Sequence, residues 1–244
     1  MDEIGREFML KTRYRFLSPS QEKQGLPQPP LELPYPPTAK LIDLPEPGMI
    51  HVPLADLRTM IEQRRSLRRY AAQPLTLEEL AYLLWTTQGV KKVTERPVTF
   101  RTVPSAGARH AFETILLVNR VEGLEPGLYR YIATRHALLR LEAPADIALR
   151  FTEACHQREH VLQSAVTFCW MAVTERMAWR YVERSMRYLH LDAGHVCQNL
   201  YLAAEAIGCG ACALAAFDDD KLNALIGADG VDCFAIYLGT VGKR

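Results

Sequence analysis

The stretch IEQRRSLRRY, residues 61–70, concentrates four arginines around one small residue, Ser66. Guanidinium groups offer fork-shaped donors to a phosphate, and a small hydroxyl lets the anion approach closely. Arg64, Ser66 and Arg68 alternate along the chain, so on an extended segment their side chains share one face. The run predicts a phosphate site, and a solvated basic surface is the alternative interpretation.

A second stretch, RTVPSAGARH at residues 101–110, contains the small-residue turn Pro104-Ser105-Ala106-Gly107 just before a strand pattern. Small residues let a flat ligand lie against the backbone. An ordinary turn explains the same residues when they are taken alone.

A third stretch, IGCGACALAAFDD, pairs Cys209 with Cys212 in a CxxC spacing. A redox CxxC opens a helix, whose N-terminus lowers the thiol pKa, whereas this one follows the helix end at Gly208. We therefore expect core packing here. The sequence has one HxxxH spacing, His156 with His160, but no HExxH motif and no second CxxC, so no metal site is expected. It also has no GxGxxG or P-loop motif, which argues against the classical dinucleotide and nucleotide folds. The GxSxG motif is absent too.

The charge balance excludes other function classes. The 244 residues include 29 Lys+Arg against 28 Asp+Glu, a net charge of +1 that gives no field to attract nucleic acid or an anionic membrane. No apolar run approaches the roughly 18 residues of a spanning helix, and the first residues lack the apolar core of a signal peptide. The six cysteines lie mostly in apolar contexts, as buried thiols do. We expect a cytoplasmic protein.

The elements that must position these residues divide the chain in two. Residues 18–53 are dense in proline, which denies the backbone both helix and central strand. The sequence predicts an extended, proline-rich arm over residues 1–52 and one domain over 53–244. The arm would wrap the body or a partner, or would be a disordered leader. Interspersed apolar residues favour docking: Leu31, Leu33, Tyr35, Leu41, Ile42 and Leu44.

The domain mixes helices and strands without a strict βαβ repeat, which favours an α+β sandwich with a mixed or antiparallel sheet. One helix is expected from Pro53, and another from the capping box of Thr76 and Glu79 to Gly89. Further strands are expected within 112–123, 127–142, 165–174, 209–217 and 232–242, and helices within 145–163, 175–207 and 218–227.

Taken in order, five stretches carry a resemblance: RRSLRRY, LLWTTQGV, RTVPSAGA, WRYVERSMRYLHLDAGHVCQNLYLAAEAIGCGACALAAFDDDKL and FAIYLGTVGKR. Together they resemble the nitroreductase family of FMN-dependent flavoproteins, in particular its SagB-like branch, which includes the azoline oxidases of peptide modification. The resemblance runs from about residue 54 to the C-terminus. It implies a three-layer sandwich, with a mostly antiparallel central sheet between helices, and a homodimer with FMN at its interface.

The resemblance also implies roles for the arginine run. Arg64 and Ser66 bind the FMN phosphate, and Arg65 assists at the phosphate or the ribityl chain. Arg68 faces the pyrimidine edge of the flavin ring, where a cation stabilises the anionic reduced form, so Arg68 is a candidate catalytic residue. One compact basic site without a glycine-rich loop for a pyrophosphate indicates FMN and not FAD.

By the same resemblance, the turn at residues 104–107 lines the flavin of the second subunit. Leu214, Ala215 and Ala216 lie against the ring, and the backbone N–H of Ala216 meets flavin N5. Many relatives have Glu-Gly where this chain has Ala215-Ala216, so a backbone donor survives here but an acidic side chain does not.

Each of three further features is compatible with two interpretations. Lys243 and Arg244 either complete the phosphate site or form a frayed basic tail. The long helix at 184–207 carries alanines and a glycine that suit close contact with a second subunit or burial within one. Tyr181 is either a candidate catalytic proton donor or lid residue, or an ordinary packed tyrosine.

One departure concerns Trp179-Arg180-Tyr181, where azoline oxidases and many SagB-like proteins have a Lys-Tyr pair. A lysine can act as a base but an arginine cannot at ordinary pH, which counts against thiazole or oxazole formation. The expected function is an oxidoreductase that passes hydride from NAD(P)H through FMN to a small organic acceptor in a ping-pong cycle. The alternatives are an azoline dehydrogenase of peptide modification and a non-catalytic FMN-binding protein.

Overall fold

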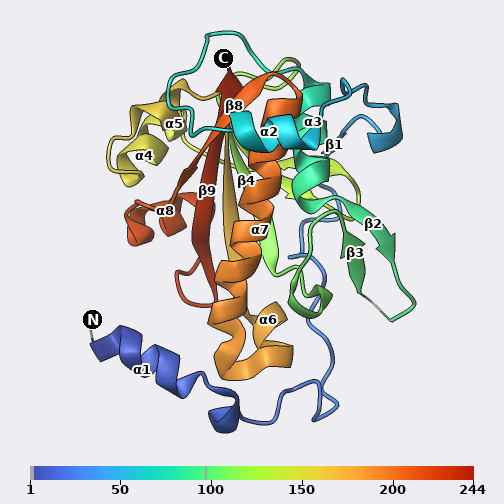
Figure 1. Ribbon diagram of the computed structural model, residues 1–244, viewed down its shortest axis with the longest axis vertical. Helices are drawn as coiled ribbons and strands as arrows, with labels where there is room; N and C mark the ends of the chain where they lie inside the picture. The colour runs from blue at the N-terminus through green and yellow to red at the C-terminus, as the bar shows by residue number, and fades with distance from the viewer. Residues whose placement is uncertain (1–2, 97) are drawn as a thin grey trace.

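The computed structural model describes residues 3–96 and 98–244 and has an α+β architecture in three layers (Figure 1). Its central sheet has seven strands in the order β1-β6-β5-β4-β7-β9-β8, and every neighbouring pair is antiparallel. The strands are β1 Leu41–Asp43, β4 Phe112–Val118, β5 Gly127–Ile132, β6 Ala137–Arg140, β7 Val166–Val173, β8 Cys209–Leu214 and β9 Cys233–Lys243. The mostly antiparallel sheet expected from the sequence is confirmed.

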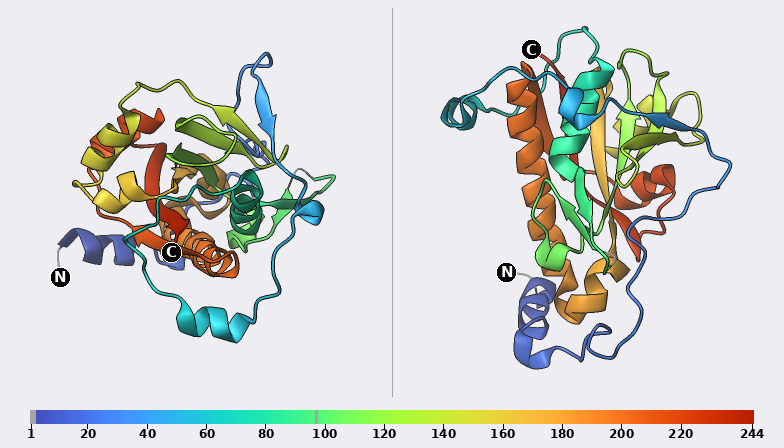
Figure 2. Two further views of the ribbon diagram at one scale, coloured as in Figure 1. Left: turned by 90° about the horizontal axis from the view of Figure 1, so that it is seen from above. Right: turned by 90° about the vertical axis from the view of Figure 1, so that its right-hand side faces the viewer.

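Helices cover both faces of this sheet. One face packs against α3 Leu77–Gln88 and α7 Ser185–Ala206, and the other against α4 Ile147–Ala154, α5 Glu159–Gln163 and α8 Asp219–Ile226. In the right view of Figure 2, α7 and α8 lie on opposite sides of the sheet. Strands β4 and β7 are buried along their whole length, which explains their unbroken apolar character.

Alternation along β4 builds two separate cores. Leu116 points to the core under α3 and α7, whereas Ile115 and Leu117 point to the core under α4 and α8. The sheet therefore forms a rigid wall between two helical layers. Strand β8 lies at one edge of this sheet, and its residues are mostly buried.

Local signals predicted several element ends correctly. Thr76 and Glu79 form the full capping box of α3, and Gly227 ends α8 in the left-handed conformation with φ 71°. The helix expected from Pro53 begins later, at α2 Leu57–Gln63, because the Asp56 side chain caps it by accepting a hydrogen bond from the Thr59 N–H.

The expected course of one helix was wrong, and one hairpin was not expected at all. The helix expected over 175–207 is broken at Val182, where φ is 42° and ψ is −124°, so that α6 Thr174–Tyr181 and a 3-10 turn Val182–Arg184 precede α7. The small hairpin of β2 Val90–Val93 and β3 Thr99–Arg101 was not predicted from the sequence. Among the described residues, no helix combines the length and hydropathy needed to cross a bilayer.

The N-terminal region is less uniform than expected. It starts with a helix, α1 Glu3–Lys11, followed by a 3-10 turn at Tyr14–Phe16, so the expectation of an extended chain was wrong there. Residues 17–40 hold neither α-helix nor strand, as their prolines require. The chain then pairs β1 with β6 and passes a second 3-10 turn, Pro47–Met49.

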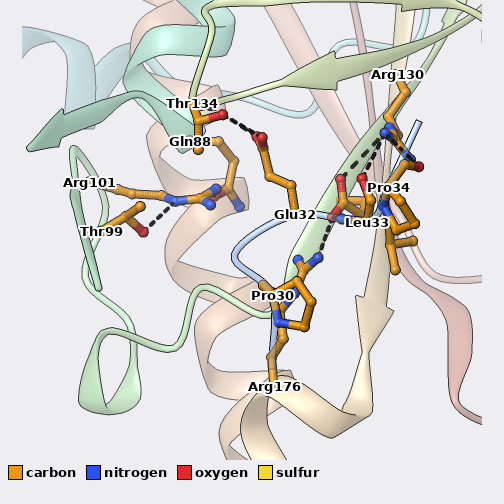
Figure 3. A network of polar contacts seen from close by, with 11 residues as sticks. Pro30, Glu32, Leu33, Pro34, Gln88, Thr99, Arg101, Arg130, Thr134 and Arg176 are labelled. Carbon is orange, nitrogen blue, oxygen red and sulfur yellow. Dashed lines mark hydrogen bonds and ion pairs between the residues drawn. The ribbon is translucent and has the colours of Figure 1, made fainter. Parts of the chain in front are cut away.

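Buried charges of the domain hold this arm in place (Figure 3). Glu113 is 2% exposed and accepts hydrogen bonds from the Leu33 N–H at 2.8 Å and from Nη2 of Arg176 at 2.5 Å. Arg176 also donates from Nε to the Pro30 carbonyl at 2.9 Å, and Arg130 donates to the Leu33 carbonyl at 3.0 Å. The backbone of the arm supplies hydrogen-bond partners to a buried ion pair of the same chain, which ties the arm to the domain.

Removing the Glu113 carboxylate should therefore destabilise the fold. Glu113→Ala leaves the Arg176 guanidinium buried without its anion, and breaking a buried pair in this way costs about 3–5 kcal/mol. Urea unfolding followed by circular dichroism measures the change in free energy of unfolding. Glu153→Ala, on an exposed position of α4, is the matched control and should change it by no more than about 0.5 kcal/mol. Equal unfolding midpoints for the two variants would contradict this view of the arm.

Candidate functional site

The arginine run lies against the free edge of the sheet. Ser66 forms a parallel bridge with Ala211 of β8, and the Leu67 N–H donates to the Ala211 carbonyl at 2.9 Å. The Leu67 side chain packs so closely on Gly210 that a Cβ there would lie 2.4 Å from Leu67 Cδ2. The segment is extended, as predicted, because it adds to the sheet at a glycine that lets it approach.

Tyr201 of α7 joins this segment to β8. Its hydroxyl lies 3.0 Å from the Ser66 Oγ and accepts a hydrogen bond from the Ala213 N–H at 2.8 Å. The guanidinium carbon of Arg64 lies 5.1 Å from the centroid of the Tyr201 ring, a cation–π distance. Tyr201 was not predicted as a site residue, because no local feature of a long helix shows that one of its tyrosines connects two other segments. Arg65 is exposed beside this group.

Arg68 lies farther along, at a cavity of about 440 Å³ between this segment and α5. The cavity is lined by Arg68, Arg69, Gln157, Arg158, Glu159, His160 and Gln163. Three arginines face a single carboxylate, so the cavity suits an anionic or electron-rich ligand.

His160 is the second site residue that the sequence did not reveal. The residue is 8% exposed, and its Nε2 atom is buried with no hydrogen-bond partner among the described residues. Burial lowers the pKa of His160, and the neighbouring cations Arg68 and Arg158 lower it further. The ring nitrogen is thus neutral and has unused capacity for a hydrogen bond with a polar ligand atom.

The turn at residues 104–107 lies elsewhere, at the other end of α7. Ser105 Oγ donates to Asp192 Oδ2 at 2.6 Å, and the Ala106 N–H donates to Asp192 Oδ1 at 3.1 Å. Gly107 has φ 56°, and a Cβ there would lie 2.7 Å from the Tyr181 hydroxyl. Glycine is therefore required where the turn meets Tyr181, and Pro104 beside it is exposed.

One chain does not bring all predicted residues together. Asp192 and Tyr201 are nine residues apart on α7, about 13 Å along the helix axis. Figure 1 shows α2 and α6 near opposite ends of this helix. The arginine run gathers with β8 and α5 near one end, and the 104–107 turn gathers with Arg180 and Tyr181 near the other.

The segment after β8 is open to solvent. Leu214 ends the strand and is buried, whereas Ala215 and Ala216 are exposed before α8 begins. Tyr181 is half-buried, and burial raises the pKa of its hydroxyl, so the phenol stays protonated at neutral pH. It can therefore donate a proton or a hydrogen bond.

The last two residues are not a frayed tail. Lys243 belongs to β9 and forms an ion pair with Glu79. Arg244 pairs with Glu205 and donates from Nε to the Cys209 carbonyl at 3.1 Å. Their role at a phosphate stays a prediction, since both charges already have partners within the chain.

The CxxC pair lies in the core, as expected. Cys209 and Cys212 are free and buried, and burial raises the pKa of both thiols, that of Cys209 to about 12. A thiolate is therefore disfavoured at either position. The described residues contain no group of three histidines, cysteines or acidic residues that could hold a metal ion.

Comparison with known proteins agrees with this arrangement. Residues 61–243 match the Nitroreductase family. The chain belongs to the nitroreductase family. It is 36% identical over 191 residues to the nitroreductase-like protein MJ1384 of Methanocaldococcus jannaschii, covering 77% of this chain and 91% of that protein. The protein is an oxidoreductase of this family, and the resemblance inferred from its motifs is confirmed.

Other relatives bear on the branch. The chain is 33% identical over 112 residues to the trifolitoxin-processing protein TfxB of Rhizobium leguminosarum bv. trifolii, covering 44% of this chain and 30% of TfxB. A nitroreductase-like protein of Anabaena variabilis has a TM-score of 0.69 at 27% identity, and the match covers 85% of this chain but 42% of that one. TfxB is named for processing a toxin, which agrees with the SagB-like resemblance.

Two more distant structures share the fold. A nitroreductase-like protein of Desulfovibrio desulfuricans in complex with FMN matches with a TM-score of 0.55 at 16% identity, over 79% of this chain and 88% of that one. The E. coli microcin synthetase McbBCD complex, with truncated pro-MccB17 bound, matches with a TM-score of 0.65 at 16% identity, over 99% of this chain and 92% of the matched chain. The nitroreductase-like fold is thus confirmed.

The surroundings of His160 predict a pH effect. Arg68→Ala should raise the pKa of His160 toward its ordinary value, because one neighbouring cation is removed; NMR titration of the histidine resonances measures this. In the native wild-type protein the pKa is lower than in the unfolded chain, so the unfolded chain binds more protons. The resulting stability is fully present above about pH 6.5, the unfolded value, and is lost as pH falls from there through the lower pKa of the native His160. Arg150→Ala, on the exposed side of α4, should leave the titration unchanged. An unshifted His160 in Arg68→Ala would mean that Arg68 does not face it.

Proposed function

We propose that this protein is an FMN-dependent oxidoreductase that transfers hydride from NAD(P)H to a small organic acceptor in a ping-pong cycle. The observation that carries the proposal is the basic cavity at the end of the arginine run, which Arg68 lines together with His160, whose buried Nε2 has no hydrogen-bond partner among the described residues. The family assignment supports an oxidoreductase. A cytoplasmic location, which the cysteine contexts favour, is part of the proposal.

The residues present fit FMN. Arg64, Ser66 and Arg65 would hold the phosphate, with Lys243 and Arg244 nearby on the β9 side of the same edge. Arg68 and His160 would meet the polar edge of the ring, and the backbone at Leu214, Ala215 and Ala216 would lie along it. The orphaned His160 nitrogen supports this fit, because a buried polar atom without a partner costs free energy unless a ligand satisfies it. FMN, when bound, accepts a hydride from one substrate and passes it to the next.

The chain's own contribution would be electrostatic and steric. The Arg68 guanidinium presents a fixed positive charge where negative charge develops during reduction, and fixed charges cost no reorganisation at that moment. Tyr201 holds Ser66 and β8 in register through two hydrogen bonds. The Tyr181 phenol, which is neutral at ordinary pH and whose pKa burial raises further, would supply a proton or a hydrogen bond to the acceptor.

We propose that the working unit is a homodimer in which each site takes the 104–107 turn from the partner subunit. The separation along α7 supports this, since one chain cannot place that turn beside its own arginine run. The apolar face of α2 supports it too: Leu57 and Ile61 are 57% and 54% exposed, and Leu54, just before the helix, is fully exposed. An apolar helix face of this kind is typical of a subunit interface.

Charge on that face should split the dimer. Leu57→Glu with Ile61→Glu should give a monomer that has lost most of its flavin, because a charge cannot be buried unpaired at an interface. Light scattering together with the flavin absorbance measures both properties. Leu149→Glu, at an equally exposed leucine of α4 (55%), is the matched control and should stay dimeric. A flavin-loaded monomer of the wild-type chain would exclude the shared site.

A second candidate function is an azoline dehydrogenase of peptide modification. The similarity to TfxB and the fold shared with McbBCD favour it. Arg180 counts against it, because an arginine in place of the lysine of the Lys-Tyr pair cannot act as a base. A non-catalytic FMN-binding protein is the remaining alternative, and bleaching of the flavin by NADH or NADPH without air would exclude it.

Two arginine variants test the assignment. Arg64→Ala should weaken FMN binding by about one to two decades, since losing one charge-assisted bond to an anion costs roughly 1.5–3 kcal/mol. Arg68→Ala should instead lower the midpoint potential and retain much of the oxidised cofactor, because its charge matters most after reduction. An FMN titration and a redox titration of each variant separate the two roles, with Arg150→Ala as control. If Arg64→Ala and Arg68→Ala changed the FMN affinity and the midpoint potential in the same way, the arginine run would be only a solvated basic surface.

A further inference from the structure

The N-terminal arm forms one wall of a cavity at the corner between α6 and α7. The cavity has a volume of about 590 Å³, and its walls include Tyr14, Glu22 and Lys23 from the arm and Arg180 and Tyr181 from α6. This volume is in the range of small-molecule sites. The cavity adjoins the 104–107 turn, because Tyr181 and Arg180 both lie against Gly107.

The corner is held in an unusual conformation. Val182 lines the cavity and has φ 42° and ψ −124°, a region that β-branched residues rarely adopt. Without this break, α6 and α7 would continue as one helix and the corner would not exist. Backbone strain of this kind concentrates at functional sites.

Glu22 brings a carboxylate to this corner. Its Oε1 atom accepts hydrogen bonds from Arg180 Nη1 at 3.1 Å and from Arg96 Nη2 at 2.7 Å. The backbone fixes its position, because the Glu22 N–H donates to the Trp179 carbonyl at 3.0 Å. The Trp179 indole in turn donates to the Leu26 carbonyl at 3.1 Å.

The charged side chains that line the cavity are unbalanced, although a further carboxylate, Glu183, lies behind the lining and accepts hydrogen bonds from Ser18. Arg180 and Lys23 line it with two positive charges against the single carboxylate of Glu22. That carboxylate is shared with Arg96, so Arg180 is only partly compensated. The Arg180 side chain is 38% exposed, which leaves donors of its guanidinium open to a ligand. Tyr14 and Tyr181 add aromatic surface for a flat molecule.

From this arrangement we propose that the cavity receives the acceptor substrate as a planar anion, such as an aromatic carboxylate, and that Glu22 is a specificity-determining residue. Arg180 binds the anionic group, and Glu22 competes for the same guanidinium and so limits the preference for anions. The proposal rests on the proposed oxidoreductase function and identifies its substrate class. In this proposal the arm has a functional role in addition to its docking on the domain, because it supplies Glu22 and Lys23 to the cavity.

A different result is expected if the ion pair between Glu22 and Arg180 has only a structural role. Pairs as exposed as these contribute about 0–1 kcal/mol to stability and have no effect on which ligand binds. A specificity residue instead changes the ratio of affinities for charged and neutral ligands of one shape. That ratio is the quantity to measure.

The probes are 4-nitrobenzoate and 4-nitrobenzamide, which share a ring and a nitro group and differ in charge. Calorimetric titration of the oxidised full-length protein without reductant gives both dissociation constants in the absence of turnover. Glu22→Gln should raise the benzoate-over-benzamide affinity ratio about fivefold, the effect of one unit charge near 4 Å in a water-rich site. Arg180→Gln should lower the ratio by a similar factor. Asp146→Asn, which removes the acid of an exposed ion pair on α4, should not change it.

Lys23→Gln provides a second variant that leaves the Glu22–Arg180 contact in place, in case Glu22→Gln loosens the arm. It should lower the benzoate-over-benzamide ratio about twofold to fivefold. An unchanged ratio in Glu22→Gln, Arg180→Gln and Lys23→Gln would overturn the proposal, as would a higher ratio in Arg180→Gln. Absence of flavin or of turnover, with the expected shifts in binding ratio, would count against the proposed oxidoreductase function alone.

Discussion

The packing of α7 against the sheet is the constraint on which the rest of this structure depends. The helix runs across β9 and contacts β8 while also packing on α3, so it is held rigidly along its 22 residues. Asp192 near one end holds the 104–107 turn, and Tyr201 nearer the other holds Ser66 and β8. Since a helix does not shorten, the two groups of site residues stay apart within one chain. A second copy of the chain is the simplest way to bring such groups together, which is why we place the proposed flavin site between subunits.

Buried charge explains how the arm is retained. A guanidinium in the interior needs several acceptors, and Arg176 finds them in Glu113 and in the Pro30 carbonyl. The arm, which is rich in proline and lacks strand partners over most of its length, has free carbonyls to offer. Two further arginines of the domain donate hydrogen bonds to carbonyls of the arm: Arg130 to the Leu33 carbonyl, and Arg184 to the Thr12 carbonyl. The arm is thus held by the domain's arginines as well as by its own apolar residues, since Leu44 is buried in one core and Leu33 packs on the other.

The two basic regions of the molecule differ in physical character. Around Arg68 the cations surround a buried neutral histidine, with Glu159 as the one acidic residue lining the cavity, an arrangement suited to a ligand with fixed negative charge. Around Arg180 the cations share a carboxylate that the arm supplies, so the field there is weaker and can be tuned by one side chain. The stronger field around Arg68 suits a cofactor that must stay bound. The weaker field around Arg180 suits a substrate that must leave.

By itself the sequence determined the helix caps, the buried strands, the antiparallel α+β class and the family, because these depend on residues a few positions apart or on motifs in order. Thr76 with Glu79 and the apolar run of β4 are examples. The roles of Arg64, Ser66 and Arg68 at a cofactor remain predictions. Only the tertiary structure revealed Tyr201, His160 and Glu22, which reach their sites from elements far away in the chain, and only it showed the break at Val182. No local pattern marks such residues, since their contacts exist only after the sheet order and the course of the arm have brought distant segments together.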